Sequence, residues 1–537
     1  MKLVTTTEMK TIENEANQKG NTFENMMQKA GEGVAQVVLD RFGDLENQQI
    51  IGLVGTGNNG GDTLVALTAL AKEGWECQAY LAAGRPVNDP LVDKLVKAGG
   101  KVVESAKDEN FSTLKSLKKK SNVLLDGLLG TGFQLPLRPE AAKILKVAGD
   151  SLGQTVVVAV DCPSGVDCAN GKTADEVISA DVTVCMAAVK AGLLNFPAAD
   201  FAGELVVVDI GLAETLDSWK NIKRTVIDDS WVRKELPYRP RNANKGTFGT
   251  TMIIGGSVNY TGAILLAGKS AYLSGSGLVR LAVPGSIHTA IAGSLVEVTW
   301  VILPHELGVI SETAVEVVFK NMEKVSCLLI GPGIGLEETT ELFLKRIFDR
   351  RVKAGVKTGI GFVMVTKEAG PGVEQLLPPL VLDADALKLI AKVPEWWKML
   401  PALTVLTPHP GEFAVMTGMT VETIQEDRLA AAEKFAREWQ HIVVLKGANT
   451  VIASPDGRTA VITVASSALA RAGSGDVLAG IIAGLMAQKM KPFEAAAAGV
   501  WIHAQAGLRA ADWIGSEASV LASDIQNSIP EVMELVS

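Results

Sequence analysis

The feature that most constrains the fold is a repeated pattern of a short apolar run, a loop rich in Gly or acidic residues, and a longer helical stretch. The run Gln49–Val54 leads into Gly55-Thr-Gly-Asn-Asn-Gly60, and a helix is predicted through Leu70. The same pattern recurs at Gln78–Leu81, Asn122–Leu125, Thr155–Val160, Val182–Cys185 and Leu205–Val208. Continuous apolar strands suit a parallel sheet that is covered on both faces. Strands that alternate with helices therefore predict a doubly wound α/β fold.

A second series of the same kind follows a polar stretch between about residues 214 and 245. Its turn-rich part, Leu236–Gly246, is either the connector between two domains or an early loop of the second. The predicted strands of this series are Thr251–Ile254, Val325–Ile330, Leu380–Leu382, Thr404–Leu406 and Ile442–Leu445. A chain of 537 residues is too long for one hydrophobic core. We therefore expect a Rossmann-like domain over residues 1–225 and a larger α/β domain over residues 226–537.

Charge and cysteine usage narrow the function classes. The formal net charge of −9 disfavours nucleic acid as a partner, because nucleic-acid binding needs a basic footprint. The five cysteines are scattered and form no CxxC pair, so neither a zinc site nor a disulfide framework is expected. Residues 1–18 contain no apolar signal segment, and no uncharged apolar stretch is long enough to cross a membrane. We expect a cytoplasmic protein with no membrane partner.

The first Gly-rich loop matches GxGxxG between a strand and a helix, which is a moderate indication of dinucleotide binding. Two observations disfavour a nicotinamide-dependent dehydrogenase. The second strand ends in Ala82-Ala-Gly-Arg85, without an acid for a ribose hydroxyl, and the loop continues with polar side chains to Asp62. The alternative is a tight turn with Asp62 as the helix N-cap. Asp126 and Asp161 end two further strands, so all three loops should meet at one edge of the sheet.

These loops together resemble the YjeF N-terminal family, the NAD(P)H-hydrate epimerases, from about Thr5 to Leu212. The matching strings are Gly57-Asn-Asn-Gly-Gly-Asp62, Asp126-Gly-Leu-Leu-Gly-Thr-Gly132, Asp161-Cys-Pro-Ser-Gly165 and Lys190-Ala-Gly192. The resemblance implies a potassium ion near Asn59, Asp126 and Ser164. It also implies substrate contacts from Asn58, Asn59, Gly60, Gly61, Asp62, Gly130, Thr131, Gly132 and Asp161. We expect Asp161 to perform acid–base work at the hydrated ring carbon. Thr63 stands where the family usually has Gly, which places a Cβ beside the substrate loop.

The second half carries Gly473-Ser-Gly-Asp476 at the predicted start of the apolar helix Val477–Met486. Small residues at a helix N-terminus expose backbone N–H groups to an anion, and Asp476 could accept a proton from a substrate hydroxyl. The alternative is a capped, tightly packed helix start. Lys446 follows a strand and is either a phosphate ligand or a solvated side chain. His409 lies between two prolines and is either structural or catalytic, and the other histidines show no metal spacing.

The ordered motifs of this half resemble the ribokinase-like YjeF C-terminal family, the ADP- or ATP-dependent NAD(P)H-hydrate dehydratases, from about Val226 onwards. The matching strings are Lys245-Gly246, Gly255-Gly-Ser with Tyr260 and Gly262-Ala263, Gly331-Pro-Gly-Ile-Gly335, Asp383-Ala-Asp-Ala-Leu387, His409-Pro-Gly-Glu412, Lys446-Gly-Ala-Asn-Thr450 and Gly473-Ser-Gly-Asp-Val-Leu-Ala-Gly480. The resemblance implies that Ala263, Gly333, His409 and Asp476 face the hydrated nicotinamide nucleotide. It implies that Lys446, Gly447, Ala448, Asn449, Thr450 and Gly475 hold the adenine nucleotide. Ser466-Ser467 stand where the family has Asn-Pro.

The two resemblances imply one repair enzyme for hydrated NADH and NADPH. The first half would interconvert the R and S epimers, and the second would return the S epimer to NAD(P)H at the expense of ADP or ATP, with Mg²⁺. Fused bacterial members favour ADP, and the family implies a homo-oligomer. One alternative is a ribokinase-like small-molecule kinase, which shares the Gly-Asp loop, fused to a nucleotide-binding regulatory domain. The other is a non-enzymatic, regulatory role for the first half.

Overall fold

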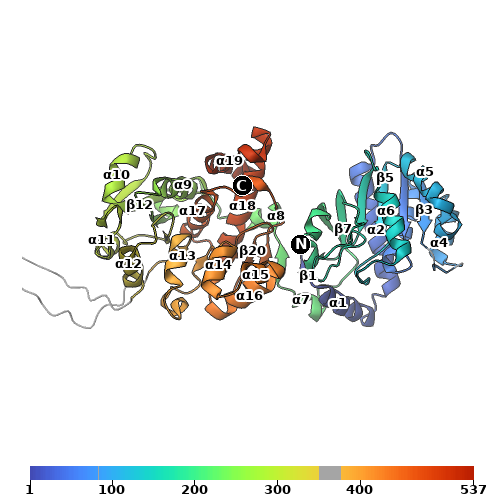
Figure 1. Ribbon diagram of the computed structural model, residues 1–537, viewed down its shortest axis with the longest axis horizontal. Coiled ribbons are helices and arrows are strands. Elements are labelled where there is room, and N and C mark those ends of the chain that lie inside the picture. The colour runs from blue at the N-terminus through green and yellow to red at the C-terminus, as the bar shows by residue number, and fades with distance from the viewer. Residues whose placement is uncertain (83, 87, 350–376) are drawn as a thin grey trace, which may run out of the picture. The chain divides into compact units, whose positions relative to one another are not determined.

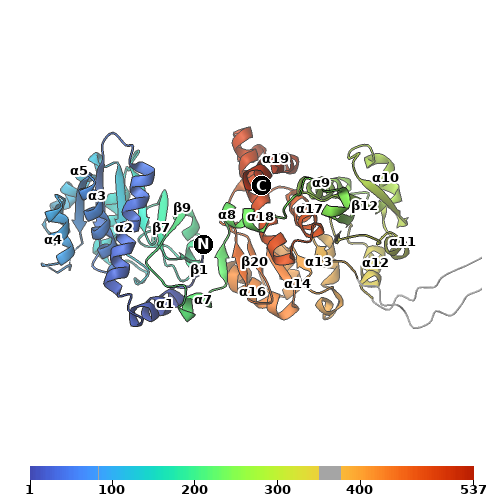
Figure 2. The same ribbon diagram turned by 180° about the vertical axis from the view of Figure 1, so that it is seen from behind.

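The computed structural model describes residues 1–82, 84–86, 88–349 and 377–537, and it is shown from two sides in Figures 1 and 2. Ala83, inside the Ala82–Arg85 stretch discussed above, lies outside the described residues. The chain forms two compact units, Met1–Val226 and Ile227–Ser537. The Leu236–Gly246 stretch lies in the second unit, between α8 (Asp229–Glu235) and β11 (Thr250–Ile254). It is therefore an early loop of that unit.

The first unit is built on a seven-stranded parallel sheet. Its strands lie in the order β4 (Lys101–Glu104), β3 (Glu76–Leu81), β2 (Gln49–Val54), β5 (Val123–Gly127), β6 (Val156–Val160), β7 (Val182–Met186) and β9 (Glu204–Val208). A separate short pair joins β1 (Leu3–Val4) to β8 (Val189–Lys190). The chain builds outward from β2 to β4 and then resumes at β5, so the strand order reverses between β2 and β5. Ligands bind at such a switch point, outside the carboxyl ends of the strands.

Helices cover both faces of this sheet, as a doubly wound fold requires. One face carries α1 (Thr6–Gln18), α2 (Phe23–Phe42), α3 (Asn58–Lys72) and α4 (Pro90–Lys97), and the other carries α5 (Ser112–Lys120) and α6 (Pro139–Gly149). Figure 1 shows α6 in front of the sheet, and Figure 2 shows α2 in front when seen from behind. Ile50 and Val54 enter one core while Ile51 and Leu53 enter the other. This alternation explains why β2 is apolar throughout. A short helix, α7 (Asp217–Lys220), follows β9.

The second unit contains a larger, mostly parallel sheet. Its strands lie in the order β21 (Thr459–Val461), β20 (Val451–Ala453), β19 (Ile442–Leu445), β18 (Val405–Leu406), β17 (Leu380–Leu382), β16 (Cys327–Ile330), β11, β12 (Leu278–Pro284) and β13 (Thr299–Leu303). The strands from β19 to β13 are parallel, whereas β20 and β21 are antiparallel. The predicted nucleotide loop, Lys446–Thr450, is the hairpin between β19 and β20, and a hairpin can join only antiparallel strands.

Two groups of helices cover this sheet. The larger core lies under α9 (Thr261–Leu273), α17 (Ser474–Ala487), α18 (Pro492–Ile514) and α19 (Ala522–Val536), which gather on one side in Figure 1. On the other side, α14 (Pro410–Thr417) and α16 (Arg428–Trp439) pack through Phe413, Phe435 and Trp439, with ring centroids 4.9–5.7 Å apart. The remaining helices are α10 (Gly285–Ile291), α11 (Ala314–Lys320), α12 (Glu338–Phe348), α13 (Asp385–Ile390) and α15 (Val421–Glu426).

Close backbone approach explains the small residues of α17. A Cβ at Gly480 would lie 2.2 Å from the carbonyl oxygen of Ala267 on α9. Glycine at this position lets the two helices pack in direct backbone contact. Within the described part of the chain, no helix is both long and apolar enough to cross a membrane.

Candidate active sites

Asp62, which follows the first Gly-rich loop, lies in the interior of the first unit and not at the N-cap of α3. α3 begins at Asn58 after Gly57, and no side chain caps it, so the alternative of Asp62 as N-cap is wrong. Asp62 is buried, and burial, followed by the charges of Asp161 and Glu13, raises its pKa well above its usual range. Burial therefore favours the neutral, protonated form of this carboxyl group.

Asp161 is held by a buried ion pair. The side chain of Lys190, which is 1% exposed, donates to Asp161 Oδ1, and the backbone N–H of Met186 donates to the same oxygen at 3.0 Å. Burial acts to lower the pKa of Lys190, but the charge of Asp161, the charge of Cys185 and the hydrogen bond to Asp161 together outweigh it, and the net shift is upward. Asp161 itself has a φ of 65°, a left-handed conformation that is uncommon outside Gly. Such a conformation in a non-Gly residue is typical of functional sites.

Asn59, Asp126 and Ser164, the predicted potassium ligands, lie together around the carbonyl of Leu129. Asn59 Nδ2 donates to that carbonyl at 2.9 Å, and the Leu129 N–H donates to Ser164 Oγ at 2.8 Å. The Ser164 N–H donates to Asp126 Oδ2 at 2.7 Å. Asp126 is completely buried, and burial raises its pKa despite these hydrogen bonds. Among the described residues, no cationic side chain forms an ion pair with Asp126.

The remaining predicted residues of this site divide into two groups. Asn58, Gly130, Thr131 and Gly132 are at least partly exposed to solvent. Gly60 and Gly61 are buried, and a Cβ at Gly60 would lie 2.1 Å from the Gly55 carbonyl oxygen. The two glycines allow the loop to close tightly. Gly130 packs against Asn59, since a Cβ there would lie 3.1 Å from Asn59 Cβ.

Thr63 points into the sheet, away from this loop. Its side chain is fully buried, and Oγ1 donates to the Asn59 carbonyl oxygen at 2.8 Å. A Cβ added at Gly127 would lie 1.7 Å from Thr63 Oγ1. Thr63 thus fills the space over Gly127 and supports Asn59 from below.

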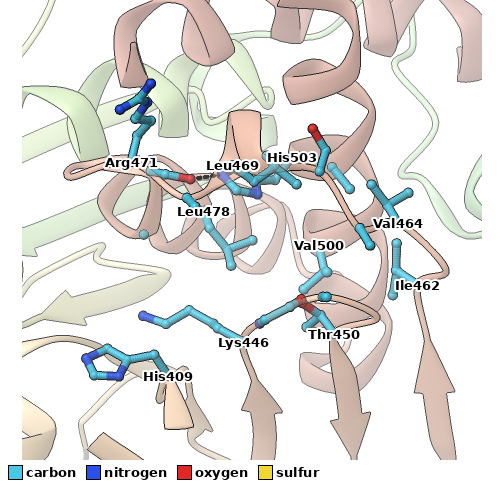
Figure 3. A pocket seen from close by; sticks show the side chains of 18 of the residues that line it. His409, Lys446, Thr450, Ile462, Val464, Leu469, Arg471, Leu478, Val500 and His503 are labelled. Carbon is cyan, nitrogen blue, oxygen red and sulfur yellow. Dashed lines mark hydrogen bonds between the residues drawn. The ribbon is translucent and has the colours of Figure 1, made fainter. Parts of the chain in front are cut away.

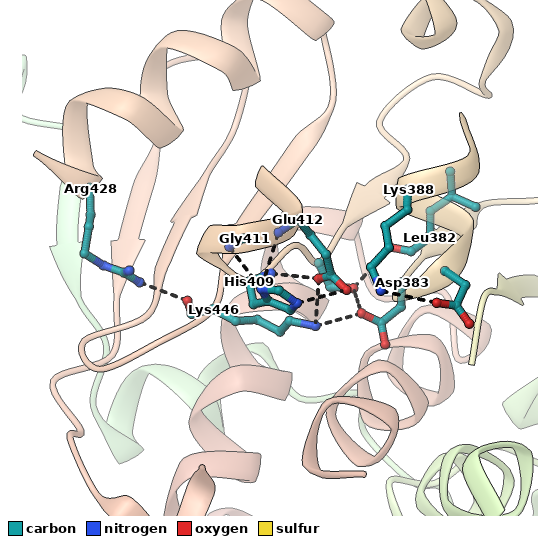
Figure 4. A network of polar contacts seen from close by, with 10 residues as sticks. Leu382, Asp383, Lys388, His409, Gly411, Glu412, Arg428 and Lys446 are labelled. Atoms are coloured by element: carbon teal, nitrogen blue, oxygen red, sulfur yellow. Dashed lines mark hydrogen bonds and ion pairs between the residues drawn. The ribbon is translucent and has the colours of Figure 1, made fainter. Parts of the chain in front are cut away.

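The centre of the second site is an ion pair between Lys446, which is partly exposed, and the buried Asp383 (Figure 4). Lys446 Nζ lies 2.9 Å from Asp383 Oδ1 and 3.8 Å from Glu412 Oε2. Burial acts to lower the pKa of Lys446, but the charge of Asp383, and then that of Glu412, reverses the shift. Thr407 Oγ1 donates to the same Asp383 oxygen at 2.7 Å. The alternative of a solvated Lys446 is therefore wrong.

Asp476 lies in the first turn of α17, beside this ion pair. Burial, then repulsion by Asp383, raises the pKa of Asp476 to about 7, although Lys446 acts in the opposite direction. Gly475 is close to both partners, since a Cβ there would lie 3.3 Å from Lys446 Nζ and 4.0 Å from Asp383 Oδ2. A carboxyl group with this pKa can act as a base near neutral pH. The adjacent N–H groups of the helix start can hold an anion.

His409 has a structural role and also faces the site. It is the N-cap of α14, where its ring Nδ1 accepts from the N–H groups of Gly411 at 3.0 Å and Glu412 at 3.3 Å. Its Nε2 lies 3.3 Å from Glu412 Oε1. Burial lowers the pKa of His409, although the charge of Glu412 opposes the shift. The ring is therefore neutral near pH 7.

A cavity of about 750 Å³ opens next to the ion pair (Figure 3). Lys446 and Thr450 lie on one side of it, at the strand ends, and Arg471 and His503 lie on the opposite side, on the helical layer. Of the predicted nucleotide residues, those lining the cavity are Lys446, Gly447, Ala448, Thr450 and Gly475. Asn449 is buried in the hairpin instead, with a φ of 51°. A volume of this size accommodates a nucleotide.

Ala263 and Gly333 lie together but do not line this cavity. Gly333 has a φ of 62°, and a Cβ there would lie 3.0 Å from Ala263 Cβ and 2.6 Å from Tyr260 Cβ. The neighbouring Gly335 N–H donates to Asp385 at 3.2 Å. Asp385 also acts on the pKa of Asp476, which connects this pair of small residues to the acidic cluster.

Ser466 and Ser467, which stand where the family has Asn-Pro, form an ordered turn at the cavity wall. Ser466 caps the turn by accepting from the Ala468 N–H at 3.2 Å, and the N–H of Ser467 donates to Glu517 at 3.0 Å. Two serines can therefore shape this loop without proline.

Sequence patterns alone assigned no role to Lys190, Asp383 or His503. Asp383 could have been singled out, because an acid directly after a buried strand repeats the signal that drew attention to Asp126 and Asp161. The partners of Lys190 and His503 are defined only by the folded chain. In the described ranges, no group of three or more His, Cys, Asp or Glu side chains is arranged to hold a metal ion.

The two units have the features of an enzyme with two candidate sites: an Asp–Lys pair at the carboxyl edge of one parallel sheet, and Asp476 at a Gly-rich helix start in the other unit. Residues 23–192 match the family described as YjeF-related protein N-terminus, and residues 251–531 match NAD(P)H-hydrate dehydratase. The bifunctional NAD(P)H-hydrate repair enzyme Nnr of Moorella thermoacetica is 35% identical, over 95% of this chain and 92% of its own. That of Escherichia coli K12 is 30% identical, over 96% and 90%. This chain belongs to the family of bifunctional NAD(P)H-hydrate repair enzymes.

Among solved structures, the ADP/ATP-dependent NAD(P)H-hydrate dehydratase of Bacillus subtilis, co-crystallised with ATP and Mg²⁺, is 28% identical. It covers 58% of this chain and 98% of its own, with a TM-score of 0.46.

Proposed function

We propose that the first unit interconverts the R and S epimers of hydrated NADH and NADPH, and that the second unit converts the S epimer back to the reduced nucleotide at the expense of ADP. One observation carries the assignment of the second unit. Asp476 is a base with a pKa of about 7 that stands at an anion-binding helix start, beside a cavity of nucleotide size. That combination suits phosphorylation of a substrate hydroxyl.

Phosphorylation solves the chemical difficulty of dehydration, because hydroxide is a poor leaving group and phosphate is a good one. Asp476 takes the hydroxyl proton while the oxygen attacks the terminal phosphorus of ADP, and AMP leaves. The C–O bond then breaks, inorganic phosphate departs, and loss of a ring proton restores the double bond. The N–H groups of Gly475 and Asp476, in the first turn of α17, would stabilise the charge on the transferring phosphoryl group.

Lys446, Thr450 and the hairpin between them would hold the adenine nucleotide, and His409, Ala263 and Gly333 would face the hydrated ring. Mg²⁺ bound to the phosphates would neutralise part of their charge, and the carboxylates around Lys446 fit a role in holding it, since Mg²⁺ prefers oxygen ligands. Asp383 and Glu412 both lie near the cavity-lining Lys446, which supports this assignment.

Epimerisation requires the hydroxyl to leave one face of the ring and water to add to the other. The ring nitrogen next to the hydrated carbon can assist departure of the hydroxyl once it is protonated. Asp62, in which burial favours the protonated form, is suited to donate that proton, and Asp161, paired with Lys190, is suited to accept one from the incoming water. Asn58, Gly130, Thr131 and Gly132 would contact the substrate.

Potassium fits the cluster of Asn59, Asp126 and Ser164. A fully buried carboxyl group is costly to ionise without a positive partner, and a bound cation would supply one. Bound potassium would fix the Leu129 loop that borders the substrate. The ligands are oxygen atoms, which suits a hard cation.

The setting that fits this function is cytoplasmic, and all five cysteines are free, buried thiols, which supports it. We also propose a homo-oligomer. Trp513 and Leu521, both on the second unit, are 85% and 61% exposed, which supports association through that unit.

The test is a repair assay on each purified epimer of hydrated NADH, followed by absorbance at the NADH band. We expect recovery of the S epimer with ADP, with one AMP and one phosphate formed per NADH, and faster recovery of the R epimer with K⁺ than with Na⁺. Failure of ADP and ATP alike to restore NADH, with phosphorylation of an unrelated alcohol instead, would establish the small-molecule kinase.

A further inference from the structure

A buried Ser–His pair stands at the start of α17, in the wall of the nucleotide cavity. Ser474 is the first residue of the helix, and its Oγ lies 2.9 Å from Nε2 of His503 on α18. Both residues line the cavity, with exposed fractions of 4% and 7%. Figure 3 shows His503 facing the cavity from the helical layer, opposite Lys446.

The pair does not serve to cap the helix. Ser near a helix start commonly accepts from the backbone of the first turn, but α17 has Gly473 as its N-cap and no side-chain cap. The Ser474 hydroxyl bonds to a side chain 29 residues away instead. It sits beside Gly475, whose Cβ position lies 3.3 Å from Lys446 Nζ. The hydroxyl is therefore fixed next to the groups that would meet the phosphates.

The charge of the pair is also defined. Burial lowers the pKa of His503 to about 4, so its ring is neutral at neutral pH and carries a single N–H. A neutral ring can either donate to the serine oxygen or accept from the serine hydroxyl, but Nε2 cannot do both. Only donation by Nε2 leaves the serine proton free for a ligand.

We propose that His503 is a positioning residue for nucleotide binding: its Nε2–H donates to Ser474 Oγ, which turns the Ser474 hydroxyl proton toward a phosphate oxygen of the adenine nucleotide. The proposal rests on the proposed function of the second unit. It adds Ser474 as a hydrogen-bond donor to a phosphate oxygen, and His503 as a residue that acts only through Ser474. A hydrogen bond to a charged oxygen is worth enough to change affinity by about tenfold.

The first test is calorimetric titration of the full-length protein with ADP and with adenosine, which has no phosphate. We expect Ser474→Ala and His503→Phe each to weaken ADP binding about tenfold and to leave adenosine binding within about twofold. The double variant should bind ADP no more weakly than Ser474→Ala, since His503 acts through Ser474. His503→Gln, whose amide can still donate, should recover most of the ADP affinity.

Several outcomes would overturn the proposal. Equal losses for ADP and adenosine would show that the pair only shapes the pocket, and additive losses in the double variant would show that His503 does not act through Ser474. Unchanged ADP affinity in both single variants would remove the pair from nucleotide binding altogether.

The second test needs no substitution at His503 and so does not depend on the folding of that variant. In protein labelled with ¹⁵N-histidine, we expect the ring of His503 to be protonated at Nε2, and its signal to shift with ADP but not with adenosine. Protonation at Nδ1 would contradict the proposal. The proposed function can fail separately, because absence of ADP-dependent NADH recovery in the wild-type enzyme would leave the comparison of ADP with adenosine intact.

Discussion

At the scale of single residues, the chemistry depends on acids whose surroundings set their charge. Asp62 and Asp476 are both held toward the neutral form by burial, whereas Asp161 faces a buried ammonium group. Sequence position predicted that these acids stand at strand ends and helix starts. It could not predict the protonation of Asp62 and Asp476, because that depends on charged groups that reach these acids only through the fold.

Asp476 makes both activity and stability depend on pH. Its folded-state pKa of about 7 lies above the ordinary 3.8, so dehydration should rise with pH and level off above about 7. The folded protein binds this proton more tightly than the unfolded chain. The free energy of unfolding should therefore fall as pH rises from 3.8 to about 7.

We therefore expect Asp476→Asn to abolish dehydration and yet to stabilise the second unit at pH 8 by roughly 1–2 kcal/mol, with no gain at pH 4. Thermal unfolding at the two pH values measures this, with His409→Gln, which leaves Asp476 in place, as the matched variant. Equal effects of Asp476→Asn on unfolding at pH 4 and pH 8 would contradict the assignment.

Asp161 should be required for epimerisation but not for dehydration. Replacement by Asn removes the acid–base group and leaves Lys190 buried without its ion-pair partner, so we expect loss of epimerisation and destabilisation of the first unit by about 3 kcal/mol. Dehydration of the S epimer should stay within about twofold of wild type, because the second unit has its own core. Normal conversion of the R epimer by this variant would refute the role given to Asp161.

At the scale of elements, the strongest apolar runs were predicted well. β2, β17 and β19 begin and end at the predicted residues, since each is buried on both faces. Sequence patterns did not predict β12 and β13 or the antiparallel pair β20 and β21, whose packing depends on neighbours distant in sequence. The helix at Val477 begins three residues earlier, at Ser474, because the Gly-Ser-Gly-Asp loop is itself the first helical turn.

Thr63, in the first turns of α3, packs over Gly127 beneath the first site. Substitutions at Thr63 test this packing. We expect Thr63→Gly to destabilise the first unit by about 2 kcal/mol, through the cavity above Gly127, the lost hydrogen bond and the cost of Gly in a helix. Thr63→Val, which keeps the volume, should cost about 1 kcal/mol.

Gly127→Ala supplies the matched control for this packing. It should destabilise strongly alone, because its Cβ would meet Thr63 Oγ1, and less so when combined with Thr63→Gly. Urea unfolding of the four proteins measures the coupling. Additive costs would show that Thr63 and Gly127 do not share this space.

At the scale of the whole molecule, each of these hydrophobic cores lies within one of the two units. Both cores of the first unit lie within residues 1–226, and the large core of the second lies within residues 227–537. Sequence length and the repeated strand–loop–helix pattern were sufficient to predict two α/β domains. The polar stretch from 214 to 245 contains no single break, and the division between Val226 and Ile227 follows from the packing within each folded unit.

Each unit should therefore fold and work alone. We expect residues 1–226 to epimerise without ADP, and residues 227–537 to dehydrate only the S epimer. An equimolar mixture of the two should repair both epimers. Circular dichroism checks folding and the absorbance assay checks activity. Loss of S dehydration in a folded 227–537 fragment would show that the second site needs the first unit.

We propose that two separate sites together return a mixture of R and S epimers to NADH. The most direct measurement is the final NADH absorbance reached from a known R and S mixture with excess ADP, for the wild-type enzyme and for Asp161→Asn. We expect the wild type to recover the whole mixture and the variant to stop at the S fraction, apart from slow spontaneous epimerisation. Complete recovery by both proteins at the same rate, or a wild type that stops at the S fraction, would contradict it.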